Sequence, residues 1–399
     1  MARSTTLRLR GWWLQVHKWI GLILAILIIP LCLSGAALVW DGALDKVLNP
    51  GRYAVTGPAS QPPSAYEAAA RGAIGPDERL VSIRYPDADG GPIVASATRV
   101  DRADGARGED RARRQGRGEG ARPGGPPQRT NIWIDPANAR VLDIAPSNAG
   151  LIRAMHMIHG SFMVPGWGRT IVGWVGVAMF FSCLTGLWLW WPISGSVRRG
   201  FRWKRQNSMS ANLHHLMGFW IVLPLAMLSF TGAWISFPQA FGRFEASAPR
   251  GGNGPPDRAR AARARPLEAT HLTADTALAA ARGRGTPSAI TWPTDQASQW
   301  KIAYRQDGTP PAEYTVDDTT GEVTPPRPPR PETKARTMRR WHDGTNMGWV
   351  WQTLIFFGGI IPAALAITGI IMWLRSRGWR AKLAAKRKAG RGPLAQPAE

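Results

Sequence analysis

Four long apolar runs interrupt an otherwise polar chain. They are Trp19–Trp40, Ile171–Ile193, Leu216–Pro238 and Trp349–Leu374. None contains an acidic residue, and each exceeds the length of about 20 residues that crosses the hydrocarbon core of a bilayer. Backbone groups inside lipid must bond to one another, so we expect each run to be a helix. The pattern therefore predicts an α-helical membrane protein with four transmembrane helices in a duplicated arrangement.

The apolar runs divide the chain into short basic segments and long polar ones. We assign transmembrane helices to residues 19–40, 166–193, 213–238 and 348–374. The short segments 1–18, 194–212 and 375–399 are rich in Lys and Arg, which marks them as cytoplasmic, so both termini are predicted to be cytoplasmic. The first run is longer than the apolar part of a signal peptide, about 7–15 residues, so we expect it to be retained.

The remaining segments, 41–165 and 239–347, should lie on the opposite side of the membrane, each as a small α+β unit. The first contains a helix pattern at 64–74 and short strand patterns at 80–85, 93–97 and 131–134; the second contains a helix pattern at 273–281, strand patterns at 289–292 and 300–304, and a hairpin at 314–323. The low-complexity stretch 101–129 cannot bury a core and is predicted to be disordered. Much of the net charge of +23 lies beside the bilayer, and no nucleic-acid-binding module is present.

A histidine motif recurs at the first and third apolar runs. His17 is followed by Gly21 and His214 by Gly218, a spacing that places each pair near one helix face. Ser34-Gly35 begins 17 residues after His17, and Thr231-Gly232 begins 17 residues after His214. Gly21 and Gly218 would leave room for a flat macrocycle beside the histidine. Gly35 lies five helical turns, about 27 Å, further along the His17 face, and Gly232 repeats this spacing from His214, so both would clear space for a second macrocycle.

A second repeat links the other two runs. Thr185-Gly186 begins 26 residues after His159, and Thr368-Gly369 begins 26 residues after His342. Two equivalent histidines on each side of the membrane predict two sites with two histidines each. His156 and His215 are the alternatives to His159 and His214, because each lies within a helical turn of its neighbour.

The chemistry of these pairs favours haem over other cofactors. Zinc normally takes four protein ligands, or three and a water, and proton-coupled transporters use carboxylates within the membrane. The apolar runs contain neither Asp nor Glu. Two axial imidazoles in apolar surroundings are typical of haem. Cys32 and Cys183 lie outside any Cys-x-x-Cys-His sequence, so haem would be held without covalent attachment.

These motifs resemble the PepSY-associated transmembrane family, which includes bacterial inner-membrane ferric-siderophore reductases. The resemblance rests on the His-x-x-x-Gly and Thr-Gly motifs, four spans and two outer segments. A PepSY-like strand–turn–strand pattern is seen in Ile134–Leu142, where Ala139 replaces the expected Gly, and in Val316–Val323, where Asp318 replaces a common Pro.

The resemblance implies a multi-pass inner-membrane protein with two PepSY-like periplasmic domains and two haem b groups. His17 and His214 would hold the inner haem iron, and His159 and His342 the outer one. Electrons would come from a separate cytoplasmic reductase or from quinol, and would reduce a ferric siderophore in the periplasm. A non-enzymatic anchor that presents PepSY modules to a peptidase or envelope partner is the alternative; a metal transporter is disfavoured by the carboxylate-free spans.

Overall fold

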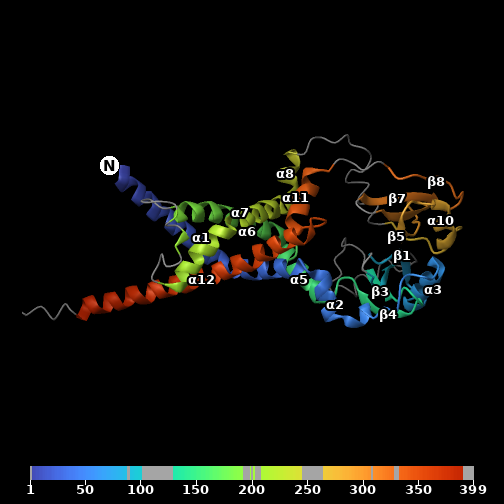
Figure 1. The fold of residues 1–399 in the computed structure, drawn as a ribbon, viewed down its shortest axis with the longest axis horizontal. Helices are drawn as coiled ribbons and strands as arrows, with labels where there is room; N and C mark the ends of the chain where they lie inside the picture. Colours follow the sequence, from blue (N-terminus) through green and yellow to red (C-terminus); the bar gives the residue numbers. More distant parts are fainter. Residues whose placement is uncertain are drawn as a thin grey trace, which may run out of the picture. The chain divides into compact units, whose positions relative to one another are not determined.

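The computed structural model describes residues 2–87, 90–100, 129–191, 198, 201–202, 208–244, 264–306, 309–327 and 332–389. The stretch predicted to be disordered, 101–129, lies outside these residues except for Arg129. The chain forms two compact units, one from residues 1–41, 154–246 and 332–399, the other from residues 42–153 and 247–331. We call them the helix unit and the sheet unit (Figure 1).

The helix unit contains four long helices, α1 (Ala2–Leu38), α6 (Gly168–Trp190), α7 (Met209–Ser236) and α12 (Gly348–Ala389). Each includes a stretch long and apolar enough to cross a membrane, namely Leu7–Leu38, Gly168–Trp190, Met209–Ser236 and Gly348–Trp379. The prediction of a membrane protein with four such helices is confirmed. Four short elements accompany them: α5 (Leu151–Ser161), α8 (Pro238–Phe241), η3 (Gly242–Phe244) and α11 (Lys334–Asp343).

Small residues let the long helices approach closely. Helices α1 and α12 pack along each other, as do α6 and α7. A Cβ atom added at Gly359 of α12 would lie 2.6 Å from the Cys32 carbonyl oxygen of α1. One added at Gly176 of α6 would lie 3.0 Å from the Ser229 carbonyl oxygen of α7. Such close backbone contact is typical of helices in membranes, where apolar burial alone does not drive association.

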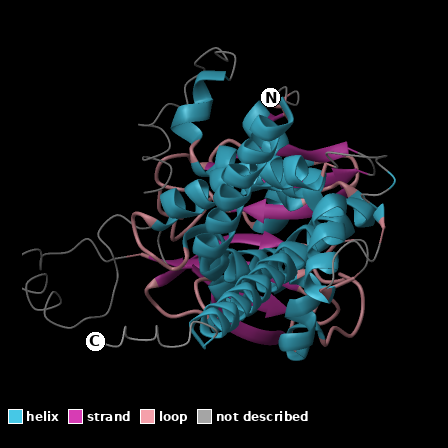
Figure 2. Ribbon diagram, turned by 90° about the vertical axis from the view of Figure 1, so that its left-hand side faces the viewer, coloured by secondary structure: helices cyan, strands magenta, loops and turns pink. Residues whose placement is uncertain are grey.

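The sheet unit is built on one antiparallel sheet of eight strands. The strands are β1 (Glu78–Arg84), β2 (Ile93–Arg99), β3 (Arg129–Ile134), β4 (Val141–Pro146), β5 (Thr286–Thr291), β6 (Gln299–Gln306), β7 (Thr309–Asp317) and β8 (Val323–Thr324). Their order in the sheet is β4-β3-β2-β1-β5-β6-β7-β8; Figure 2 draws these strands in magenta. The first four come from the first polar segment and the last four from the second, so both halves repeat one order outwards from the centre.

The two polar segments, expected to form separate units, therefore share a single sheet. They meet where β1 pairs with β5, with Ile83 opposite Ile290. In each half alone, β1 or β5 would be an edge strand with unpaired backbone groups. Their pairing satisfies the backbone groups of both strands. The helices α3 (Pro63–Ala73) and α10 (Ala274–Ala281) contact each other and the strands, close to the positions where the sequence predicted helices. Tyr66, Ile83, Ile290 and Trp300 are fully buried in the shared core.

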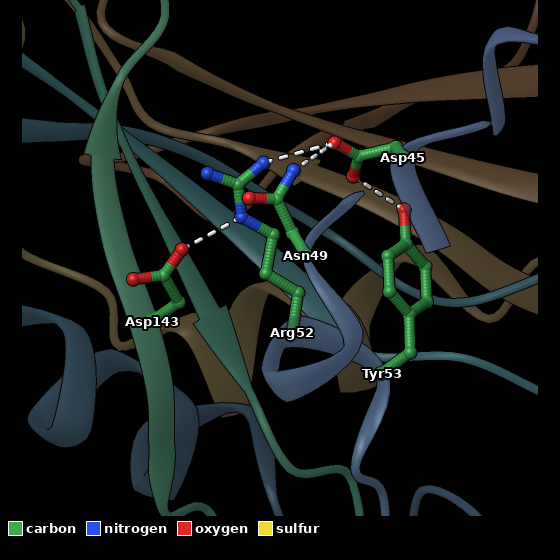
Figure 3. Close-up of polar contacts among 5 residues, drawn as sticks. All are labelled: Asp45, Asn49, Arg52, Tyr53 and Asp143. Carbon is green, nitrogen blue, oxygen red and sulfur yellow. Dashed lines mark hydrogen bonds and ion pairs between the residues drawn. The ribbon is translucent and has the colours of Figure 1, made fainter. Parts of the chain in front are cut away.

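The side chain of Arg52 links the first residues of the sheet unit to one of its strands (Figure 3). Arg52, in the 3-10 helix η1 (Pro50–Tyr53), donates to Asp143 of β4 at 2.6 Å and to Asp45 of α2 (Asp41–Leu48) at 3.0 Å. Its guanidinium lies 4.0 Å from the centre of the Trp133 ring. Tyr53 donates to the second Asp45 oxygen at 2.7 Å. Because two carboxylates pair with the Arg52 guanidinium, we assign this residue a role in holding the fold together.

Candidate functional site

Four histidines of the helix unit form two facing pairs. The rings of His17 on α1 and His214 on α7 have centroids 6.4 Å apart and planes at 84°. The rings of His159 on α5 and His342 on α11 have centroids 6.0 Å apart and planes at 38°. These are the two pairings that the repeat spacings predicted. The structure therefore brings together residues that lie between 183 and 197 positions apart in the chain.

Each of the four rings lies against the glycine of a Ser/Thr-Gly motif on another helix. The motifs are Ser34-Gly35, Thr185-Gly186, Thr231-Gly232 and Thr368-Gly369. A Cβ atom added at these glycines would lie close to a histidine Cε1 atom: 2.5 Å at Gly35 (His159), 3.2 Å at Gly186 (His17), 3.1 Å at Gly232 (His342) and 3.7 Å at Gly369 (His214). At Gly35, a side chain would force the ring to move, and at Gly186 and Gly232 the ring would have to give by a few tenths of an ångström.

Three of these motifs also supply a hydrogen-bond partner for the ring that their glycine contacts. The Nδ1 atoms of His17, His342 and His214 lie 2.9, 3.0 and 3.0 Å from the hydroxyl oxygens of Thr185, Thr231 and Thr368, respectively. The Nδ1 atom of His159 lies 2.8 Å from the backbone carbonyl oxygen of Leu31. Among the described residues, hydrogen bonds reach the Nδ1 atom of each ring and leave Nε2 for another ligand.

The contacts follow a reciprocal plan. Helix α1 contributes His17 to one pair, and its Gly35 contacts His159 of the other pair. Helix α7 likewise contributes His214 to the first pair, and its Gly232 contacts His342 of the second. The glycines of α6 and α12 contact the histidines that α1 and α7 supply. Each histidine pair thus draws one ring from the α1–α5–α6 half and one from the α7–α11–α12 half.

The neighbouring histidines lie elsewhere. The ring of His215 stacks on Trp190, with centroids 6.0 Å apart and planes at 22°. His156 is exposed on α5. At Gly21 and Gly218, predicted to leave space beside His17 and His214, an added Cβ would meet no atom within 4 Å. Of His156 and His159, it is therefore His159 that contacts a Ser/Thr-Gly motif and a facing histidine. Of His214 and His215, it is His214.

Burial keeps the second pair in the form that binds metals. Burial lowers the pKa of His159, and burial together with the charge that His159 would carry lowers the pKa of His342 to about 4. Both rings are neutral at neutral pH, and a neutral imidazole is the form that donates a nitrogen lone pair to a metal. Within the part of the chain that the structure describes, no group of three or more His, Cys, Asp or Glu side chains gathers as a metal centre. The donor set is thus two nitrogens per site.

Sequence reasoning missed how the four Ser/Thr-Gly motifs act. Thr185-Gly186 and Thr368-Gly369 entered only as spacing markers, and Gly35 and Gly232 as space for a macrocycle. All four glycines instead contact histidine rings. The recurrence of a hydroxyl residue before glycine in every apolar run was the available signal.

A comparison with models of known protein families identifies the family of this membrane protein. The chain matches the family model described as the PepSY-associated TM region over residues 14–376. Because the match covers most of the 399 residues, the chain belongs to the PepSY-associated transmembrane family. No curated protein matches the chain.

Proposed function

We propose that this chain is a di-haem b-type electron-transfer protein of the bacterial inner membrane that reduces ferric siderophores in the periplasm. The observation that carries the proposal is the pair of facing histidine sets, with ring centroids 6.4 and 6.0 Å apart. In this reading, the chain is duplicated, and each half would contribute one histidine to each haem site.

The pair spacing would let both imidazoles of a pair hold one haem iron. A metal lies about 2 Å from an imidazole nitrogen, so facing rings with centroids 6.4 and 6.0 Å apart leave room for one ion between them. The hydrogen bonds at Nδ1 leave Nε2 as the ligating atom at all four rings. Zinc would need further ligands that the described residues do not gather.

The residues divide between two sites. His17 and His214 would hold the haem on the cytoplasmic side, and His159 and His342 the haem on the periplasmic side. When bound, each haem supplies an iron that alternates between Fe(III) and Fe(II) and so carries one electron. Gly21 and Gly218 leave the adjoining helix faces open, and the apolar side chains of the bundle exclude water. A cytoplasmic reductase or quinol would supply the electrons.

The charge on α11 supports an anionic iron chelate as the electron acceptor. This helix carries His342 and four basic residues, of which Lys334, Arg336 and Arg339 are exposed. Siderophores hold Fe(III) through hard oxygen donors that are often anionic, and a basic surface attracts such a complex. One electron per iron converts bound Fe(III) to Fe(II), which these donors hold less tightly, so the metal is released.

The decisive measurement is the absorption difference between dithionite-reduced and oxidised purified protein. We expect a b-type haem spectrum at two haems per chain, and loss of about one haem in each of the His17→Ala and His342→Ala variants. His215→Ala is the matched control, because that ring stacks on Trp190 instead of facing a histidine. A colourless protein from haem-replete cells would exclude the proposal and favour a non-enzymatic anchor.

The acceptor is tested separately, with protein reduced in detergent and mixed with ferric siderophore under argon. We expect reoxidation of the haem together with formation of Fe(II), trapped by a ferrous chelator. The double variant Arg336→Glu/Arg339→Glu should slow reduction of an anionic chelate more than that of a neutral one, without altering the haem spectrum. Haem that stays reduced in the presence of every ferric chelate would leave electron transfer intact but exclude the acceptor.

A further inference from the structure

We infer that Thr185, Thr231 and Thr368 are positioning residues that fix the tautomer of the histidine each contacts, so that Nε2 alone can bind the haem iron. We further infer that His159 is oriented differently, by the backbone carbonyl of Leu31. This inference rests on the proposed haem sites. It assigns a role to residues that contact the histidines and would not themselves bind the iron.

A count of protons at each threonine supports the assignment. A hydroxyl group carries one proton to donate and can accept other hydrogen bonds. Thr231 donates to the Met227 carbonyl oxygen at 2.8 Å, and Thr368 donates to the Ala364 carbonyl oxygen at 2.9 Å. Thr185 likewise donates to the Ser182 carbonyl oxygen at 3.0 Å. With its proton directed at that carbonyl oxygen, each hydroxyl accepts from the facing imidazole.

The imidazole must then carry its proton on Nδ1. The distances of 2.9–3.0 Å between Nδ1 and the threonine oxygens are those of an ordinary hydrogen bond. With the proton on Nδ1, the lone pair lies on Nε2, as a ligand to iron requires. Such an outer hydrogen bond also fixes the ring orientation and raises the basicity of the ligating nitrogen. The glycine that follows each threonine completes the arrangement by admitting the ring edge.

The fourth position uses a different acceptor for the same tautomer. Ser34 precedes Gly35 as the threonines precede their glycines, but its hydroxyl donates to the carbonyl oxygens of Pro30 and Leu31, at 2.7 and 3.0 Å. His159 Nδ1 donates directly to the Leu31 carbonyl at 2.8 Å. A carbonyl can only accept, so the proton again lies on Nδ1. Three of the four histidines thus have a threonine hydroxyl as a partner of Nδ1, whereas the partner of His159 Nδ1 is a backbone carbonyl.

The test compares Thr→Val, which removes the hydroxyl with little change in shape, with Thr→Ser, which keeps it. For Thr185, Thr231 and Thr368, we expect the valine variant to bind haem about 10- to 100-fold more weakly at the affected site. The midpoint potential of that haem should shift upwards, because a less basic imidazole stabilises Fe(III) less. The serine variant should restore both. Haem titration of the apoprotein and spectroelectrochemistry measure these quantities without turnover.

Two internal references make the result interpretable. The haem at the unaltered site should keep its wild-type potential in every variant, which separates a local effect from misfolding. Ser34→Ala should leave both haems unchanged, because its hydroxyl bonds backbone carbonyls and not His159. Valine variants with wild-type affinity and potential would overturn the inference while leaving the haem proposal standing. Wild-type protein without haem would overturn both.

Discussion

The sheet unit holds buried carboxylates and the helix unit holds half-buried imidazoles, and the hydrogen bonds of the two sets differ. In the sheet unit, Asp318 is 1% exposed and accepts hydrogen bonds from the backbone of His271 and Leu272 and from the Trp300 indole. Asp135 is fully buried and accepts from the backbone and hydroxyl of Thr56. Both carboxylates are fully engaged within the protein.

In the helix unit, by contrast, four imidazoles are each engaged at one nitrogen. Their Nδ1 atoms bond to threonine hydroxyls or a carbonyl, and the described residues supply no hydrogen bond to Nε2. A buried polar group with all its partners stabilises a fold, whereas a half-buried imidazole with a free nitrogen lone pair is available to bind a ligand. The comparison explains why we place the function at the histidines and not at the buried carboxylates.

The pKa of Asp135 agrees with a structural role. Burial by itself would raise this pKa, but hydrogen bonds from Thr56, Ala137 and Asn138 outweigh burial and hold it below its usual value. The carboxylate is therefore charged at neutral pH and stabilises the fold wherever the pH exceeds about 4. That contribution is lost only as the pH falls through the lowered pKa.

The largest expected effect comes from adding a methyl group beside a histidine of the helix unit. Gly35→Ala would place a Cβ atom 2.5 Å from His159 Cε1, whereas Gly369→Ala would place one 3.7 Å from His214 Cε1. The first distance requires the ring to move, and the second is an ordinary contact. We expect Gly35→Ala to abolish the haem at the His159/His342 pair, and Gly369→Ala to retain both haems. Haem content per chain measures the difference, and equal content in the two variants would contradict the role of the glycine contact.

The next largest effect is expected from removing a carboxylate of the sheet unit whose hydrogen bonds are all made within the protein. Asp318→Ala leaves three donors, the His271 and Leu272 amides and the Trp300 indole, without their acceptor. Each buried donor left unpaired costs about 1–3 kcal/mol, so we expect the three together to lower the stability of this unit by at least about 3 kcal/mol. Limited proteolysis should then cut within residues 264–327 while haem content stays unchanged.

The neighbouring carboxylate provides the control for this measurement. Asp317 bonds to the Thr319 and Thr320 amides of its own turn, in a position open to solvent. Water can replace these bonds, so Asp317→Ala should leave the protease resistance nearly that of the wild type. Similar cleavage of the two variants, or loss of haem in either, would contradict the separation between the units.

The smallest effect compares the two corresponding turns of the sheet unit. Ala139 has φ of 58° and Gly321 has φ of 70°, and the amide of each donates to the aspartate carbonyl four residues earlier, Asp135 and Asp317, at 2.9 Å. A left-handed conformation costs a non-glycine residue about 1 kcal/mol. We therefore expect Ala139→Gly to raise the thermal unfolding midpoint of the sheet unit, and Gly321→Ala to lower it by a similar amount. Shifts of the same sign would show that the turns do not correspond.

The sequence by itself determined the parts of this protein that depend on local composition. Length and apolarity were sufficient to identify the four long helices, because a segment without charges can satisfy its backbone in lipid only as a helix. Equal spacings from histidine to the Ser/Thr-Gly motifs were sufficient to match His17 with His214 and His159 with His342. Turn residues at 135–140 and 317–322 located both hairpins and revealed Ala139 as a departure from glycine.

Only the tertiary structure decided which groups meet across the chain. Adjacent residues such as His214 and His215 point about 100° apart on a helix, and the packing of α7 against α12 and α6 determines that one contacts Gly369 and the other Trp190. The pairing of β1 with β5 joins segments that lie two hundred residues apart, and no local pattern encodes it. The choice between the Ser34 hydroxyl and the Leu31 carbonyl as the partner of His159 depends on helix approach, because a hydrogen bond is made or lost within a few tenths of an ångström.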